Sequence, residues 1–486
     1  MFVPHAPQAT IPMDWLHRHA FSTWATFSLS SLAYDGLVAY RRVEGAAGAT
    51  IVGALATNAP APSRDGKTYV FTLRPGLRYS DGRPVRATDF RASMERFLQG
   101  TRELPPAWAF PEYYAGIAGA PQCMHSQAPC DLSRGIETDS PARTITVHLT
   151  RRDADFLHKL TMAFAFVGPA GSRARASTGR TPPGTGPYRV TAWDATRGGT
   201  LVRNRYFRAG PARSRPDGFV DRIEIGVHDK RTIERRIAAV QRGAADLAVL
   251  ADPFATLVSQ DRLRALLARS PGQLHSKPAP NTDWIFFNTQ RRPFDSTRVR
   301  RAVNLAIDRD RVVELSGGSE SGQPTCQVLP VGFPGYAPYC PYTAPPTTTG
   351  RWTAPDMGQA RRLVAASGRA GDHVLVRVPD FREAVGRYYA RLLEDLGFRT
   401  TVRVLSFLDD DSWDPDARAQ TGFVGWGADY VAPSTFVKTM FECAARGTYN
   451  LSLLCNKTLE RQISRAVATP HARQRRWWWL SPTRDS

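Results

Sequence analysis

The stretch 374–404 limits the fold of this chain more than any other segment. Val374–Val378 reads as a β-strand, Ala384–Leu396 as an amphipathic helix, and Thr400–Val404 as a second strand. Gly397 stands where a helix C-terminus favours a left-handed residue. A strand, a helix and a strand in this order form a βαβ unit, whose right-handed crossover makes the two strands parallel. The sequence therefore predicts an α/β fold.

Other predicted elements agree with this fold class. A chain of 486 residues is too long for one core and is expected to hold two to four domains, at about 100–200 residues each. No segment approaches the run of about 18 apolar residues that a membrane-spanning helix needs. Strands are predicted at Tyr69–Leu73, Thr144–Leu149, Leu247–Leu250, Asn281–Asn288 and Phe423–Gly425, and from Tyr188 onward. Helices are predicted at Phe21–Tyr34, Thr88–Leu98 with Thr88 as N-cap, Arg231–Gln241, Val299–Ile307, Met357–Ala366 and Leu459–Val467.

One carboxylate stands out by its sequence context. Asp429 is flanked by Trp426 and Tyr430 and lies just past the predicted strand at Phe423–Gly425. Ligands of open α/β sheets bind beyond the carboxyl ends of strands. A carboxylate between aromatic rings, where water is partly excluded, attracts a cation strongly. The alternative interpretation is that Asp429 caps a helix at Pro433–Met440.

The cysteines fall into three pairs that are local in sequence. Their spacing and their Pro-, Gly-, Asn- and Ser-rich surroundings favour three disulfides, and disulfides imply an oxidising, extracytoplasmic compartment. The alternative is six reduced, buried thiols. No histidine lies at zinc-site spacing from any pair, so no metal is predicted. Met1–Trp15 carries no export signal, so either the signal lies outside this chain or the start of the sequence is wrongly assigned. The predicted pairs are Cys123–Cys130, Cys326–Cys340 and Cys443–Cys455.

The net charge of +20 does not indicate nucleic-acid binding. Lysine occurs only six times, and the arginines are spread along the chain, often beside acids, as in the run Asp308–Arg311. No basic run with interleaved aromatic residues is present. The Gly184–Gly186 run is followed by Pro187, which removes a backbone donor and argues against a phosphate loop. No G-x-S-x-G or H-E-x-x-H motif is present, so no catalytic residue and no cofactor are predicted.

Four blocks of the sequence resemble the extracytoplasmic solute-binding proteins of the peptide/nickel family of ABC importers. The first and third of these blocks are long and specific, and the resemblance covers about residues 30 to 466. The blocks are Tyr69–Asp89, Gly184–Tyr188, Phe287–Arg309 and Gly425–Tyr430.

The resemblance implies a two-lobed, periplasmic-binding-protein-like α/β fold of class II type, which captures a peptide or similar small solute in an interlobe cleft. Lobe one would comprise 1–30 and 181–280, with an extra α/β subdomain at 31–180, and lobe two 281–470. Members of the family begin with a strand of lobe one, and the proline-containing Met1–Pro12 is a poor match for that strand. Residues 471–486 form an atypical tail. Truncation at both ends is therefore expected.

The resemblance also implies roles and partners. Asp429 would pair with the α-ammonium group of a peptide, while Trp426 and Tyr430 would shape the ligand site. Arg74, Asp81 and Asp89 are expected to be structural. The protein would be a monomer associated with the cell envelope, delivering its ligand to an ABC permease. A ligand-sensing module of a larger regulatory protein and a truncated, non-functional relative are the alternatives.

Overall fold

The computed structural model describes most of the chain. The described residues are 2–4, 30–100, 110–126, 128–172, 181–194, 198–210, 217–228, 233–252, 255–256, 258, 260–275, 279–347, 349–405 and 419–469. The chain divides into two compact units, of which unit 1 holds 1–250 with 467–471 and unit 2 holds 251–466 with 472–486. The finer predicted division into two lobes, a subdomain and a tail stays a prediction, and the tail at 471–486 lies outside the described residues.

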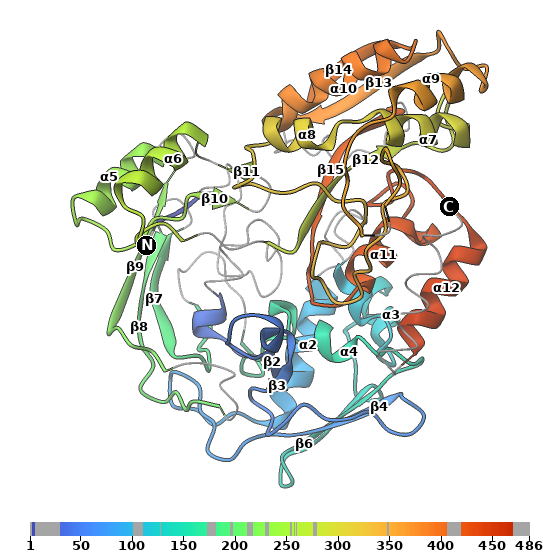
Figure 1. Ribbon diagram of the computed structural model, residues 1–486. Helices are drawn as coiled ribbons and strands as arrows, with labels where there is room; N and C mark the ends of the chain where they lie inside the picture. The colour runs from blue at the N-terminus through green and yellow to red at the C-terminus, as the bar shows by residue number, and fades with distance from the viewer. Residues whose placement is uncertain are drawn as a thin grey trace. The chain divides into compact units, whose positions relative to one another are not determined.

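Unit 1 contains two larger sheets (Figure 1). The first has the strand order β1-β9-β8-β7, with β1 parallel to β9 and the other pairs antiparallel. The second is antiparallel, in the order β4-β6-β5, and β2 and β3 form a separate pair. The strands are β1 (Phe2–Pro4), β2 (Val38–Tyr40), β3 (Ile51–Gly53), β4 (Thr68–Thr72), β5 (Ile136–Asp139), β6 (Thr144–His148), β7 (Tyr188–Asp194), β8 (Gly198–Arg203) and β9 (Arg222–His228). The α-helices are α2 (Ala87–Gly100), α3 (Ala120–His125), α4 (Phe156–Lys159) and α5 (Ile233–Gln241).

The core of the antiparallel sheet follows from the alternation of apolar residues in β6. Ile145, Val147 and Leu149 are buried, as the predicted strand requires. Helix α2 packs against β5 and α3 and buries Phe90 and Phe97 along one face. The Phe97 ring stacks on Phe164 and meets Tyr114 edge-on in this core.

Three predictions for unit 1 need correction. Leu247–Leu250 forms no regular strand, because only Ala248 makes a β-bridge there, and Leu247 is half exposed. Met1–Pro12 was expected to be a poor strand, yet Phe2–Pro4 forms β1 and pairs with β9. Pro4 lacks a backbone N–H, but it is the last residue of β1, and β1 is an edge strand, where proline is tolerated. Thr88 is not an N-cap, because α2 already begins at Ala87. Only the end of the helix predicted at Phe21–Tyr34 falls in the described part of the chain, and Ser30–Ala33 are helical there.

Unit 2 is built on a mixed sheet with the strand order β12-β15-β13-β14. β13 runs parallel to β14 and to β15, and β12 runs antiparallel to β15. The strands of this unit are β10 (Ala251–Asp252), β11 (Ala255–Thr256), β12 (Asn281–Phe287), β13 (His373–Pro379), β14 (Arg399–Leu405) and β15 (Thr421–Gly427). Its α-helices are α6 (Gln260–Arg269), α7 (Thr297–Ala306), α8 (Arg309–Leu315), α9 (Met357–Ala365), α10 (Glu383–Asp395), α11 (Ser434–Phe441) and α12 (Lys457–Ala468), the last of which ends within unit 1.

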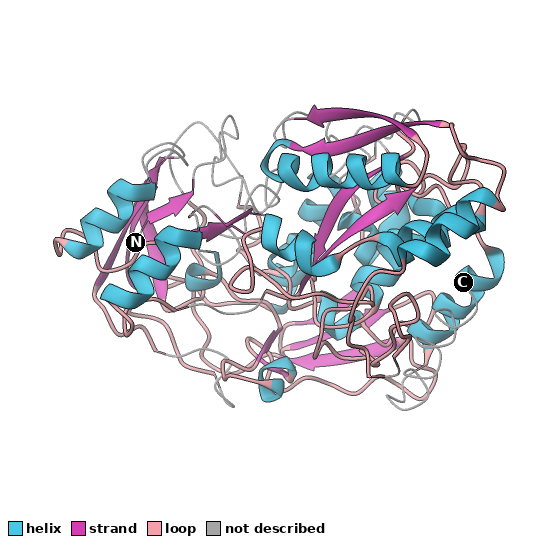
Figure 2. Cartoon of the chain, turned by 45° about the horizontal axis from the view of Figure 1, so that its top comes forward, coloured by secondary structure: helices cyan, strands magenta, loops and turns pink. Residues whose placement is uncertain are grey.

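The predicted βαβ unit is confirmed as β13, α10 and β14. Helix α10 packs against both parallel strands and buries Tyr389 and Leu393 in a core that also takes apolar residues of α7 and α9 (Figures 1 and 2). Burying an aliphatic or aromatic side chain of this size contributes about 1.5–3 kcal/mol. Gly397 follows α10 with a φ of 94°, the left-handed conformation that its position requires.

The three predicted disulfides are present as Cys123–Cys130, Cys326–Cys340 and Cys443–Cys455. Each closes a short loop within one unit. In the part of the chain that the structure describes, every helix is too short or too polar to cross a lipid bilayer.

Candidate functional site

Asp429 lies just beyond the end of β15, as the sequence predicts. It is half-buried, and its backbone N–H donates to Thr435 Oγ1 at 3.1 Å. The Thr435 hydroxyl in turn donates to Asp429 Oδ2 at 3.3 Å. Thr435 lies in the first turn of α11, whose N-terminal end stabilises negative charge. Pro433 is the N-cap of this helix, so Asp429 contacts α11 through a side chain and is not its capping residue.

The two aromatic neighbours of Asp429 are packed inside unit 2. Tyr430 is only 2% exposed, and its hydroxyl is 2.8 Å from Ser434 Oγ. Trp426 is 9% exposed and meets the Tyr449 ring edge-on, with the ring centroids 4.7 Å apart. Direct contact of either ring with a ligand stays a prediction.

Three buried polar atoms at this end of the sheet have no hydrogen-bond partner among the described residues. They are Asn281 Oδ1, Thr282 Oγ1 and Trp426 Nε1. Thr282 stands directly opposite Trp426 in the β12–β15 ladder, and Asn281 stands opposite Gly427. Buried polar atoms are nearly always paired, so Thr282 and Trp426, which share one face of the sheet, suit a polar guest that supplies the missing partners, while Asn281 lies on the other face.

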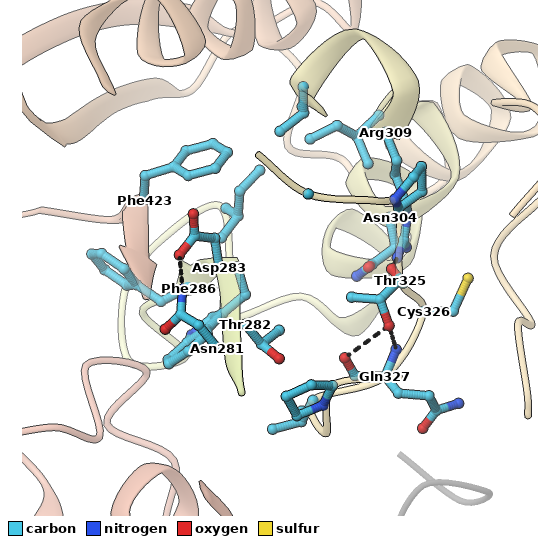
Figure 3. A pocket seen from close by; sticks show the side chains of 18 of the residues that line it. Asn281, Thr282, Asp283, Phe286, Asn304, Arg309, Thr325, Cys326, Gln327 and Phe423 are labelled. Atoms are coloured by element: carbon cyan, nitrogen blue, oxygen red, sulfur yellow. Dashed lines mark hydrogen bonds between the residues drawn. The ribbon is translucent and has the colours of Figure 1, made fainter. Parts of the chain in front are cut away.

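A cavity of about 1110 Å³ opens beside β12 and lies entirely within unit 2 (Figure 3). All seven residues of β12 line it, together with residues of α7 and α8, the segment 319–331 and Tyr449. Its volume is slightly above the range of about 300–1,000 Å³ that is usual for ligand pockets. Sequence reasoning missed this cavity, although the four-residue apolar run Trp284–Phe287 and the arginines of α7 and α8 were visible in the sequence.

An ion pair stands at the edge of this cavity. Arg382 Nη2 is 2.5 Å from Asp283 Oδ2, and Asn281 Nδ2 donates to Asp283 Oδ1 at 3.1 Å. Gly425 lies opposite Asp283 in the ladder, and a Cβ atom at Gly425 would lie 2.2 Å from Asp283 Oδ1. The glycine is therefore needed for the close approach of the Asp283 carboxylate to β15.

Replacing Gly425 by alanine is expected to lower the stability of unit 2 by about 1–3 kcal/mol, because the added methyl group must displace the Asp283 carboxylate from its place beside Arg382. The midpoint of urea unfolding, followed by tryptophan fluorescence, measures this change. Gly272→Ala is the matched control, because a Cβ atom there meets nothing within 4 Å. Equal midpoints for the two variants would contradict the prediction.

The other residues singled out in the sequence have structural contacts in unit 1. Arg74 donates from Nε to the Ala54 carbonyl at 2.7 Å, and burial lowers the pKa of its guanidinium. Asp81 accepts from the Arg83 guanidinium at 2.7 Å in an exposed turn. Asp89 is buried at the start of α2. Among the described residues, no group of three His, Cys, Asp or Glu side chains is placed to hold a metal ion.

Two α/β units, a mixed sheet and a carboxylate beyond the end of one strand define a protein of the two-lobed periplasmic-binding class. The model of the family "Bacterial extracellular solute-binding proteins, family 5 Middle" matches residues 50–448. The chain therefore belongs to this family of solute-binding proteins.

Relatives with known names support this assignment. The chain is 26% identical over 259 residues to the oligopeptide-binding protein OppA of Bacillus subtilis (strain 168), a match that covers 52% of this chain and 44% of OppA. It is 25% identical over 442 residues to the probable di/tripeptide-binding protein 5 of Pseudomonas aeruginosa (strain UCBPP-PA14). This match covers 85% of this chain and 75% of the relative. The chain thus spans less than half of the first relative's length and three quarters of the second's.

Solved structures confirm the fold. The clavulanic acid biosynthesis oligopeptide binding protein 2 matches with a TM-score of 0.81 at 22% identity, covering 99% of this chain and 87% of that one. The murein tripeptide binding protein MppA of Escherichia coli matches with a TM-score of 0.72 at 19% identity, covering 99% and 88%.

Proposed function

We propose that this protein captures a small peptide and delivers it to an ABC permease in the cell envelope, with the Asp429 carboxylate pairing with the α-ammonium group of the peptide. The observation that carries this proposal is the position of Asp429, half-buried just past β15 and held by Thr435 at the N-terminal end of α11. A fixed, partly desolvated carboxylate binds a cation better than a mobile surface acid does.

Three further observations support the proposal. The family is one of solute-binding proteins, and relatives over most of this chain carry names of peptide-binding proteins. The unpartnered atoms of Thr282 and Trp426 suit a ligand rich in hydrogen-bonding groups, as a peptide backbone is. The three disulfides suit an extracytoplasmic protein. Binding and release require no catalysis, and we propose a monomer without enzymatic activity.

Replacing Asp429 by asparagine is expected to weaken peptide binding roughly tenfold or more, because a charge-assisted hydrogen bond is worth about 1.5–3 kcal/mol and a tenfold change is about 1.4 kcal/mol. Calorimetry with a pool of random tripeptides measures the affinity. N-acetylation of the pool, which removes the ammonium group, should weaken binding to the wild type and leave the variant nearly unaffected. Asp395→Asn, an exposed acid at the end of α10, is the control. Unchanged affinity in the Asp429 variant would exclude the proposed role of this carboxylate.

A further inference from the structure

Phe219 is the most exposed large apolar side chain of the described residues, with 82% of its surface open to solvent. It lies in unit 1, in the segment 217–221 that leads into β9, and the neighbouring Val220 is 52% exposed. The hydroxyl of Tyr188, at the start of β7, donates to the Val220 carbonyl at 3.0 Å and accepts from the Val220 N–H at 3.3 Å. These two bonds fix the backbone, so Phe219 and Val220, together called the apolar tip, are held in a defined place.

Two arginines stand beside the apolar tip at the ends of neighbouring strands. Arg203 is the last residue of β8, and its Nε lies 3.8 Å from an Asp221 carboxylate oxygen. Arg222 is the first residue of β9 and pairs with Glu224 at 2.7 Å. All four side chains are at least half exposed. Exposed ion pairs gain little from each other, so both guanidinium groups stay available to an anion that approaches from solvent.

Three further arginines at this end of unit 1 form no ion pair with a carboxylate of the described part of the chain. Arg205 and Arg208 follow β8, Arg78 lies in the turn before α2, and all three are exposed. The Arg205 guanidinium lies over the Tyr206 ring, 4.8 Å from its centroid. The turn and the segment after β8 are in contact, because a Cβ atom at Gly82 would lie 3.0 Å from the Tyr206 hydroxyl oxygen.

The segments around the apolar tip are predominantly positive. In 78–86, 203–210 and 217–222, which we call the basic patch, seven arginines stand against three aspartates. The last two segments adjoin each other, since the Arg203 N–H donates to the Asp221 carbonyl at 3.0 Å. Apolar side chains flanked by exposed arginines suit the boundary between the headgroups and the acyl chains of an anionic bilayer. The charge therefore favours a lipid surface over an apolar protein surface as the partner.

We propose that this end of unit 1 docks on an anionic lipid surface, with Phe219 and Val220 entering the headgroup region and the arginines of the basic patch binding lipid phosphates. An exposed aromatic ring gains free energy when it leaves water, and a guanidinium matches two phosphate oxygens. The net charge of +20 adds attraction at longer range. The inference goes beyond the proposed function and does not depend on it, because the patch belongs to unit 1, whereas Asp429 and the cavity belong to unit 2.

The charge part of the proposal is tested by flotation with vesicles. We expect the full-length protein to bind vesicles of equal parts phosphatidylglycerol and phosphatidylcholine roughly tenfold or more tightly than vesicles of phosphatidylcholine alone, and added salt should weaken this binding. Arg205→Gln combined with Arg208→Gln should weaken it roughly tenfold or more. Arg301→Gln combined with Arg391→Gln removes the same charge from exposed positions of α7 and α10 and should weaken it less than about threefold. Equal losses for the two double variants would show attraction by net charge alone and overturn the proposal.

The apolar part is tested with the same anionic vesicles. Phe219→Ser should weaken binding roughly tenfold, because the ring no longer leaves water. Phe219→Trp should keep the affinity, since tryptophan is favoured at membrane interfaces. Val70→Ser changes a 51% exposed valine of β4 in the same unit and should alter binding less than about twofold. Wild-type affinity in Phe219→Ser overturns the docking role of the tip. Absence of binding to both kinds of vesicle overturns the lipid assignment and assigns the tip to a protein partner. Peptide affinity, measured without vesicles, is unchanged in every one of these outcomes.

Discussion

Replacing Lys159 by methionine is expected to destabilise unit 1 by about 3–5 kcal/mol, because the change removes the cation from a nearly buried ion pair. Lys159 Nζ forms an ion pair with Asp153 Oδ2, and the two side chains are only 5% and 12% exposed. The Asp153 carboxylate also accepts from the Asp155 N–H at 3.0 Å, so it is held in place when the lysine is removed. Methionine keeps much of the length and apolar contact of the lysine stem.

The thermal unfolding temperature of unit 1 measures this loss, which corresponds to a decrease of roughly 6–20 °C for a unit of this size. The double variant Lys159→Met with Asp153→Asn should recover a large part of it, since both charges of the pair are then removed together. Arg83→Met breaks the Arg83–Asp81 pair of the same unit, whose side chains are 56% and 38% exposed, and should change stability by less than about 1 kcal/mol. Equal effects of breaking the buried and the exposed pair would contradict the argument.

Local sequence signals predicted the parts of the fold that depend on short-range order. The βαβ unit at 373–405 follows from apolar spacing and a glycine after the helix, and both are confirmed. The disulfides follow from the proximity of cysteines in the sequence, with separations of only 7, 14 and 12 residues. The position of Asp429 follows from the predicted strand before it, because a residue two positions past the end of a strand must lie near that end.

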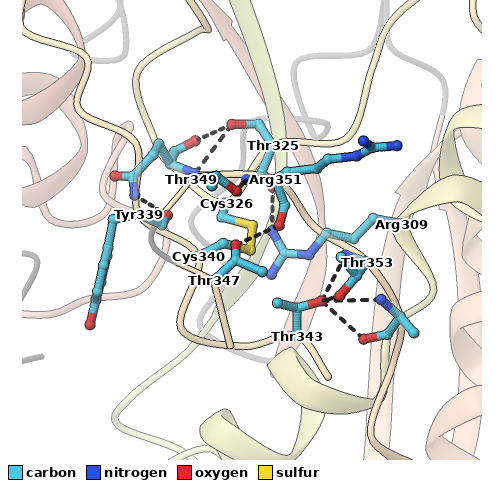
Figure 4. The surroundings of a disulfide bond; sticks show 12 residues. Arg309, Thr325, Cys326, Tyr339, Cys340, Thr343, Thr347, Thr349, Arg351 and Thr353 are labelled. Carbon is cyan, nitrogen blue, oxygen red and sulfur yellow. Dashed lines mark hydrogen bonds between the residues drawn. A yellow bond between two sulfur atoms is a disulfide. The ribbon is translucent and has the colours of Figure 1, made fainter. Parts of the chain in front are cut away.

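Features that depend on distant segments were not predictable in the same way. The Arg382–Asp283 ion pair joins residues 99 positions apart, and nothing in either local sequence indicates the partner. Arg309 stands between two aspartates in the sequence, which suggests a solvated ion pair, yet its side chain turns towards Thr325 in the cavity wall (Figure 4). The run Leu247–Leu250 shows the converse, because it makes only a β-bridge at Ala248, and an apolar run becomes a full strand only where a neighbour pairs along its length.

Tyr69–Asp89, one of the two long blocks that indicated the family, contains a buried carboxylate with several hydrogen-bond donors. Asp89 Oδ2 accepts from the Tyr79 hydroxyl at 3.0 Å and from the Arg86 N–H at 2.8 Å, and Oδ1 accepts from the Ala170 N–H at 2.8 Å. Asp89 and Tyr79 are 4% and 1% exposed. Burial, and then the Asp89 charge, raise the pKa of the Tyr79 hydroxyl, which therefore stays a proton donor. One side chain thus joins the start of α2, the preceding turn and a distant loop.

Replacing Asp89 by alanine is accordingly expected to lower the stability of unit 1 by about 2–4 kcal/mol, since one buried hydroxyl and two partly buried N–H donors lose their acceptor at once. Unfolding in urea, monitored by circular dichroism, measures the loss. Tyr79→Phe removes one of the donors and should cost only about 1 kcal/mol alone, and much less in the Asp89→Ala background, where its acceptor is already absent. Thr88→Ala is the neighbouring control, because Thr88 lies inside the first turn of α2 and should change stability by less than about 0.5 kcal/mol. A larger loss of stability for Thr88→Ala than for Asp89→Ala would contradict this prediction. It would indicate that Thr88 caps α2 and that the Asp89 carboxylate contributes little to the stability of this block.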